Sequence, residues 1–262
     1  MRIYNKSSKR NKEENMKDYV EIEISENESA IKVLNVPKNF ENNTYSYMYQ
    51  NPIFKIFSNI VYYGIAYPIL TIILKLVYDL KIEGKENIQK IEAGAVTVSN
   101  HVLILDCAMI GIACGRKKVC FTTQEESFEI PFVKNLIKLL NAIPIPKKIK
   151  EKKYFIEEVN KRLKNHKIVH FYPEASLIPY CSEIRNFKNG CFDFAVKNNV
   201  PVIPMVFIFR EPKRIRKFFK RKKDVTLKIG EPIWGEEKEI LKDNTYNKMK
   251  EILEESNKKI GH

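Results

Sequence analysis

From about residue 81 onward, short apolar runs alternate with segments of helical periodicity. Runs rich in Val, Ile and Phe are typical of buried strands, and apolar positions three and four residues apart are typical of helices. The runs predict strands at 95–98, 118–123, 142–146, 167–172, 201–209 and 224–229. The segments between them predict helices at 106–115, 130–140, 150–165, 187–198 and 240–258. We therefore expect an α/β fold with a mostly parallel central sheet flanked by helices.

An uncharged stretch, Ile56–Leu74, precedes this alternation and is bracketed by Lys55 and Lys75. Its length just reaches the roughly 18–20 residues of a membrane-spanning helix. Gly64, Pro68 and several tyrosines interrupt it, and tyrosine prefers the headgroup interface. We expect two short helices that lie in one leaflet of a membrane. A pair of buried core helices is the alternative.

Residues 1–45 carry Lys, Glu, Asn and Ser with few aromatic residues, which favours a flexible polar tail. The 262 residues are then divided into this tail, an apolar, membrane-associating helical segment at 46–80, and an α/β domain at 81–262. The start of the chain is charged and no apolar run follows it directly, so we expect no secretory signal.

The net charge is strongly positive, at +14, and favours an anionic partner. Eight of the eleven residues in 213–223 are basic, and Phe218 and Phe219 lie among them. This run could dock on anionic lipid headgroups or be a solvated loop. No nucleic-acid-binding motif accompanies it, so we expect no nucleic-acid partner. We expect a protein associated with the cytoplasmic face of the cell membrane.

The five cysteines are scattered and form no C-x-x-C pair. Their odd number and their spacing argue against a disulfide framework and against a zinc site, and suit a reducing compartment.

His101 and Asp106 stand where the predicted strand 95–98 gives way to the predicted helix 106–115. Five residues apart on one helix, their side chains would diverge by about 140° around the axis. They can meet only if His101 precedes the helix and Asp106 lies in its first turns. The carboxylate could then accept from one imidazole nitrogen and leave the other as a base. A loop histidine beside a helix-capping aspartate is the simpler alternative.

Two more charged residues follow predicted strands. Lys147 follows Asn141–Pro146, and Glu174 follows His170–Tyr172 and Pro173. Ligands of α/β sheets bind beyond the carboxyl ends of the strands, so His101, Lys147 and Glu174 could share one cleft. A base, a carboxylate and a cation in one cleft would suit acyl transfer to a hydroxyl of a phosphate-bearing acceptor.

The order of these motifs resembles the glycerolipid acyltransferases, in particular the 1-acylglycerol-3-phosphate acyltransferases. That family has N-H-x4-D, a strand ending in Arg, F-P-E-G-T-R-S, and a V-P-(V/I)-(I/V)-P strand. The resemblance covers roughly residues 80–230, and the last motif corresponds to Val200–Pro204. Among the departures from the family pattern, Lys147 stands for Arg, Ala175 for Gly and Leu177 for Arg.

The resemblance implies direct transfer without a covalent acyl-enzyme. His101 would act as the base and Asp106 would orient it. Asn100 would belong to the substrate-binding set, and Glu174 would bind acceptor hydroxyls or organise its turn. Lys147 and Arg185 would hold phosphate, with Lys188 as an alternative to Arg185.

The expected reaction moves a fatty acyl group from a thioester to 1-acylglycerol 3-phosphate, giving phosphatidic acid in phospholipid synthesis. Acyl-CoA or acyl-carrier protein would be the donor, and no metal or other cofactor is expected. Glycerol 3-phosphate or another lyso-lipid could replace the acceptor. A non-catalytic, basic membrane-surface protein is the alternative from another class, and a hydrolase is disfavoured because no G-x-S-x-G elbow is present.

Overall fold

A computed structural model describes residues 56–57, 59–115, 117, 119–124, 142–146, 149–212 and 222–260, with the backbone alone at 149–151 and 260. Four expectations fall outside these residues: the tail 1–45, the helix 130–140, the placement of Lys147, and residues 213–221 of the basic run.

The centre of the fold is a seven-stranded sheet in the order β1-β7-β6-β2-β5-β3-β4. All neighbouring strands are parallel except β6 and β7, which are antiparallel. The mostly parallel sheet confirms the predicted fold class. The strands are β1 (Lys81–Glu83), β2 (Ala95–Ser99), β3 (Val119–Gln124), β4 (Ile143–Ile145), β5 (Ile168–Phe171), β6 (Val202–Arg210) and β7 (Asp224–Ile229).

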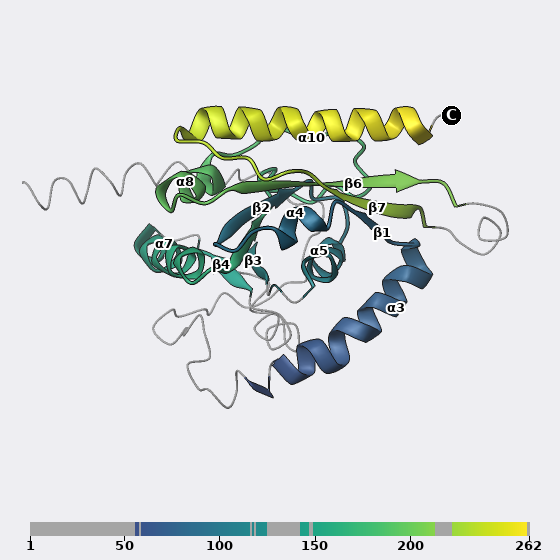
Figure 1. Ribbon diagram of the computed structural model, residues 1–262, viewed down its shortest axis with the longest axis horizontal. Helices are drawn as coiled ribbons and strands as arrows, with labels where there is room; N and C mark the ends of the chain where they lie inside the picture. The colour runs from purple at the N-terminus through teal and green to yellow at the C-terminus, as the bar shows by residue number, and fades with distance from the viewer. Residues whose placement is uncertain are drawn as a thin grey trace, which may run out of the picture.

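Helices cover both faces of the sheet, with α10 and α8 on one side and α3, α4 and α5 on the other (Figure 1). Four predicted helices are confirmed within three residues at each end. The described helices are η2 (Val61–Ala66, a π-helix), α3 (Tyr67–Tyr78), α4 (Glu86–Gln89), α5 (Asp106–Cys114), α7 (Ile149–Lys164), α8 (Gly190–Lys197) and α10 (Lys238–Ile260).

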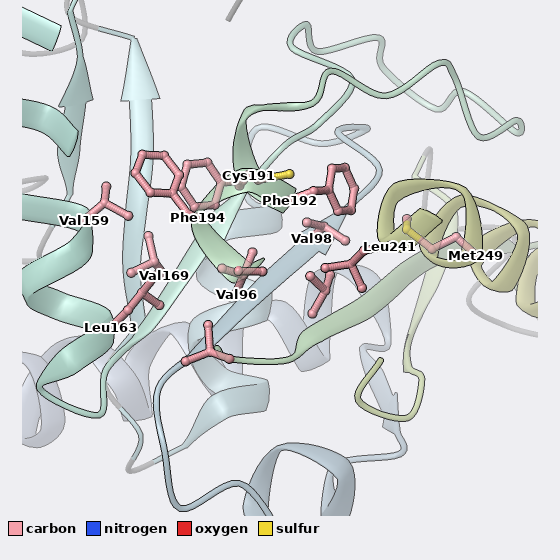
Figure 2. Packing of buried hydrophobic residues seen from close by; sticks show 14 of the residues in the cluster. Val96, Val98, Val159, Leu163, Val169, Cys191, Phe192, Phe194, Leu241 and Met249 are labelled. Carbon is pink, nitrogen blue, oxygen red and sulfur yellow. The ribbon is translucent and has the colours of Figure 1, made fainter. Parts of the chain in front are cut away.

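Alternate residues of the central strands point to two separate cores. Val96 and Val98 of β2 pack with buried side chains of α7, α8 and α10. Figure 2 shows this cluster, including Val169 of β5 and the Phe192 and Phe194 rings of α8. The other core contains side chains of α3, α4 and α5. Because both faces are covered, β2 and β5 are apolar along most of their length, which made them visible in the sequence.

The apolar stretch forms one continuous helical run, Val61–Tyr78, and not the two separate short helices that we expected. The N–H of Tyr67 donates to the carbonyl of Tyr62, five residues back, as in a π-helix. Pro68 follows directly, in the first turn of α3. Since Pro68 has no N–H to donate, the change of hydrogen-bond register just before it lets the helix pass through the proline.

This helical run has an exposed apolar face and a docked face. Ile72 and Leu76 are 60% and 67% exposed, whereas Leu74 and Tyr78 are buried in the core beneath α5. The hydroxyl of Tyr67 donates to the Ile112 carbonyl of α5 at 3.4 Å. Among the described residues, Val61–Tyr78 has the length and the apolar composition that a helix needs to cross a membrane.

Candidate active site

The turn after β2 is anchored by Asn100, whose side chain is buried. Its amide nitrogen donates to the Phe207 carbonyl of β6 at 3.2 Å, and its amide oxygen accepts from the Phe207 N–H at 2.9 Å. Both ends of the amide are therefore engaged with the backbone of the neighbouring strand. In this arrangement Asn100 positions the residue that follows it.

That residue, His101, forms a short hydrogen bond with Asp106. Nδ1 of His101 lies 2.6 Å from Oδ2 of Asp106. His101 precedes α5 and Asp106 is the first residue of that helix, so the geometry expected from the spacing is confirmed. The Asp106 side chain is 1% exposed and the His101 side chain 24%. An ionised carboxylate can only accept, so Nδ1 carries the proton and Nε2 is left with a free lone pair.

Tyr172 belongs to the same cluster, although the sequence did not single it out as a site residue. Its hydroxyl donates to Oδ1 of Asp106 at 2.6 Å, so both carboxylate oxygens have a partner. Its ring stacks on the His101 imidazole with the ring centroids 3.9 Å apart. Tyr172 directly follows β5, the strand next to β2, and this adjacency is not visible in the sequence.

A second histidine, His170 of β5, lies beneath this cluster and is completely buried. Its Nδ1 lies 2.9 Å from the Thr97 hydroxyl, and its Nε2 lies 3.3 Å from the Ser99 hydroxyl. Burial, together with the nearby His101, lowers the pKa of His170 to about 3. His170 is therefore neutral at physiological pH and part of the polar framework between β2 and β5.

Glu174 and Arg185 form a clamp on the turn after β5. Oε2 of Glu174 accepts from Nη2 of Arg185 at 2.6 Å and from the His101 backbone N–H at 3.3 Å. Oε1 accepts from the Arg185 backbone N–H at 3.1 Å. Nη1 of Arg185 also donates to the Ser176 hydroxyl at 2.7 Å. Burial raises the pKa of Glu174, and the hydrogen bonds from Arg185 and His101 oppose that rise.

The structure brings four of the predicted site residues together: Asn100, His101, Asp106 and Glu174 lie at or just beyond the carboxyl ends of β2 and β5. Arg185 joins them through Glu174, with its side chain one-fifth exposed. Lys147 lies outside the described residues. The backbone N–H of Lys188 donates to the Pro173 carbonyl at 2.9 Å, so this residue is also adjacent to the turn.

Ala175 adopts a left-handed backbone conformation with φ of 64°. Side chains with a Cβ are disfavoured there, and glycine is not. The left-handed backbone conformation of this turn therefore suits the glycine of the family motif. In this chain the turn has the same conformation with alanine at position 175.

The site chemistry favours a base and not a thiol nucleophile. Burial and the adjacent Asp106 carboxylate raise the pKa of Cys107 to about 12, so its thiol stays protonated. Among the described residues, no three or more His, Cys, Asp or Glu side chains gather in a way that could hold a metal ion. His101, held by Asp106 and Tyr172, can accept a proton from a bound hydroxyl.

Comparison with known proteins identifies a matching family and similar proteins. The acyltransferase family model matches residues 79–208, the span that contains His101, Asp106, Tyr172, Glu174 and Arg185. Over these residues the chain matches the acyltransferase family. Within that family it is similar to the 1-acyl-sn-glycerol-3-phosphate acyltransferases.

Two chloroplastic 1-acyl-sn-glycerol-3-phosphate acyltransferases show this similarity. The one from Brassica napus is 25% identical over 180 residues, which are 67% of this chain and 51% of that protein. The one from Arabidopsis thaliana is 27% identical over 132 residues, which are 50% of this chain and 36% of that protein. The chain thus spans about half of the first relative's length and about a third of the second's.

A solved structure has the same fold. The crystal structure of the 1-acyl-sn-glycerophosphate (LPA) acyltransferase PlsC from Thermotoga maritima matches with a TM-score of 0.50 at 24% identity. The match covers 67% of this chain and 71% of that one.

Proposed function

We propose that this protein transfers a fatty acyl group from a thioester to the free hydroxyl of 1-acylglycerol 3-phosphate, giving phosphatidic acid. The observation that carries the proposal is the His101–Asp106 hydrogen bond at the carboxyl end of β2, inside the span that the acyltransferase family model matches. The similarity to 1-acyl-sn-glycerol-3-phosphate acyltransferases supports this acceptor.

The proposed mechanism is a direct transfer with His101 as general base. Nε2 of His101 takes the proton of the acceptor hydroxyl while that oxygen attacks the thioester carbonyl. The tetrahedral intermediate then collapses: the carbon–sulfur bond breaks, the thiolate leaves, and His101 returns the proton to it. Asp106 keeps the proton of the neutral imidazole on Nδ1 and stabilises the imidazolium that forms.

The residues around the base have separate proposed roles. Asn100 and Glu174 hold the backbone of the His101 turn from two sides, through Phe207 and through the His101 N–H. Lys147 and Arg185 bind the phosphate of the acceptor, and lysine at position 147 supplies charge without the bidentate geometry of arginine. The donor is acyl-CoA or acyl-carrier protein, both of which a strongly basic protein attracts.

The proposed site of action is the cytoplasmic face of the cell membrane. The exposed apolar side chains of Val61–Tyr78 and the positive net charge support attachment to an anionic membrane surface. Attachment would bring the enzyme to an acceptor that resides in the lipid phase.

A substrate panel tests the proposal. Purified protein is incubated with radiolabelled acyl-CoA or acyl-carrier protein and with 1-acylglycerol 3-phosphate, glycerol 3-phosphate or lysophosphatidylcholine. We expect labelled phosphatidic acid as the main product, and the His101→Ala protein should form almost none. Label released as free fatty acid in the wild type would indicate a hydrolase. No acyl transfer to any acceptor with either donor would overturn the proposal.

A further inference from the structure

Tyr172 occupies a position that ring packing alone does not explain. Its ring is fixed by two imidazoles: it stacks on His101 and meets His170 edge-on, with a centroid distance of 4.6 Å. A phenylalanine would make both contacts, and the family motif has phenylalanine here. The hydroxyl adds one interaction, the 2.6 Å hydrogen bond to Oδ1 of Asp106.

We propose that Tyr172 is a positioning residue: by donating to Oδ1 of Asp106 it turns Oδ2 toward Nδ1 of His101 and sets the pH at which His101 takes up a proton. A carboxylate with only one partner could rotate about its terminal torsion, because that torsion is broad. With both oxygens bound, the carboxylate has one orientation. The inference deepens the proposed function, on which its kinetic part rests.

Tyr172 is suited to be a permanent donor. Burial and the Asp106 carboxylate raise its pKa well above the ordinary value, so the hydroxyl keeps its proton at physiological pH. Its hydrogen bond also draws charge from the carboxylate, which weakens the attraction of Asp106 for a protonated His101. Without the hydroxyl Asp106 keeps more of its charge, and a protonated imidazole still holds Oδ2 at Nδ1, so His101 should bind a proton at higher pH.

The other titratable groups around His101 and Asp106 do not change the expected direction of this shift. From the α5 side, Cys107 lies beside Asp106 and stays a neutral thiol. From β5, His170 is neutral. From the turn after β5, Glu174 contacts the His101 backbone, and its charge is paired with Arg185. None of these groups contacts Oδ1 of Asp106 among the interactions of the described residues, so none takes the place of the hydroxyl.

Tyr172→Phe is the first test, because it keeps the ring and removes only the hydroxyl. We expect kcat to fall about three- to tenfold, with the KM of donor and acceptor nearly unchanged, because orientation of a catalytic base acts mainly on the transition state. The acid limb of the pH profile of kcat/KM should move up by about 0.5–1 pH unit. Tyr246→Phe is the matched control: it also removes a tyrosine hydroxyl, one that lies 3.4 Å from the Ile184 carbonyl, and should leave the profile in place.

An NMR titration separates this inference from the proposed function, because it needs no substrate. The chain has four histidines, so the labelled His101 signal is assigned by its loss in His101→Ala. The His101 midpoint should rise in Tyr172→Phe and not in Tyr246→Phe. In the Asp106→Asn background, Tyr172→Phe should have no further effect on the midpoint, because the hydroxyl acts through that carboxylate.

The outcomes are distinct. A raised midpoint in a wild type that transfers no acyl group would support the positioning role and overturn the proposed function. An unchanged midpoint in Tyr172→Phe would overturn the positioning role, whether or not the enzyme is active. An equal effect of Tyr172→Phe with and without Asp106 would also overturn it, since the hydroxyl would then act by another route.

Discussion

The carboxyl group of Glu174 accepts a hydrogen bond from the backbone N–H of His101, and this contact joins the turns that follow two adjacent strands of the sheet. The same carboxyl group is paired with Arg185 and is completely buried. The base therefore lies on a turn whose backbone is held by a charged side chain from outside its own segment. A change at Arg185 can reach His101 through Glu174 even though Arg185 and His101 are far apart in the sequence.

Arg185→Ala is expected to raise the acceptor KM about ten- to a hundredfold, because a charge-assisted contact to phosphate contributes about 1.5–3 kcal/mol. It should also lower the free energy of unfolding by about 3–5 kcal/mol, because Glu174 loses the cation that compensates its buried charge. Steady-state kinetics and urea unfolding measure the two effects. Arg185→Lys, which keeps the charge, should recover part of both. Lower stability with an unchanged acceptor KM would show that Arg185 stabilises the fold and does not bind the acceptor phosphate.

Lys147→Ala should raise the acceptor KM by a similar factor, with the donor KM unchanged, if this residue holds the phosphate. Lys147→Arg should retain most of the activity, since the family pattern has arginine at this position. Kinetics with 1-acylglycerol 3-phosphate and with a neutral lyso-lipid show whether the loss depends on phosphate. If neither Lys147→Ala nor Arg185→Ala changes the acceptor KM, the acceptor is not held through phosphate at these residues.

His101→Ala should lower kcat by about two to four orders of magnitude, the range typical of a general base. Asp106→Asn should lower kcat as well, because the amide can no longer stabilise the imidazolium, while donor binding stays close to that of the wild type. Rapid-quench measurements with labelled donor would follow the chemical step directly. Near-normal turnover in both variants would exclude His101 as the base.

The sequence predicted six of the seven strands of the described sheet, because β2, β5 and β6 are buried on both faces and therefore apolar along most of their length. It missed β1, whose three residues contain a single apolar side chain, and α4, which has only four residues. It paired His101 with Asp106 because that contact depends on local spacing. The contacts of Tyr172 with Asp106 and of Asn100 with Phe207 depend on which strands are neighbours, and local patterns do not contain that information.

The neutral state of His170 should make stability depend on pH. An unfolded histidine binds a proton below about pH 6.5, whereas the pKa of His170 in the folded protein is lowered to about 3. The unfolded state therefore holds more protons between these values. The contribution of His170 is fully present above about pH 6.5 and is lost at about 1.4 kcal/mol per pH unit as the pH falls.

Urea unfolding at neutral pH and at about pH 5 measures this dependence. The free energy of unfolding of His170→Asn should fall less steeply with pH than that of the wild type. His166→Asn, at an exposed histidine, is the control and should keep the wild-type slope. Equal slopes in the wild type and His170→Asn would show that His170 does not differ between the folded and unfolded states.

Ala175→Gly is expected to stabilise the protein by about 0.5–1 kcal/mol. The left-handed conformation costs a residue with a Cβ about 1–2 kcal/mol, and the greater freedom of glycine in the unfolded chain offsets part of the gain. Thermal unfolding should show a raised Tm. Ala195→Gly, in the interior of α8, should shift Tm in the opposite direction. A lowered Tm for Ala175→Gly would contradict the assignment of strain to this turn.

The exposed face of α3 should govern membrane binding. We expect the wild type to sediment with anionic vesicles, and high salt to weaken the binding without abolishing it, because salt does not screen apolar contacts. Ile72→Glu combined with Leu76→Glu should reduce vesicle binding at least about tenfold, since burial of each apolar side chain contributes roughly 1.5–3 kcal/mol. Ile240→Glu, at an exposed isoleucine of α10, is the matched control. Full recovery of the wild type in the supernatant at low salt would contradict a membrane role for this face.

Because Leu74 and Tyr78 are buried, they limit where the chain can be shortened or joined to another protein. Both side chains complete the core beneath α5, the helix that begins with Asp106. A shortened protein that starts after Tyr78 would expose this core, and we expect it to aggregate instead of yielding a water-soluble catalytic fragment. For the same reason, the exposed side chains of α3 could be exchanged for those of another membrane-binding helix, whereas the buried side chains of Leu74 and Tyr78 could not. The apolar helix is a structural part of the enzyme and not an exchangeable module.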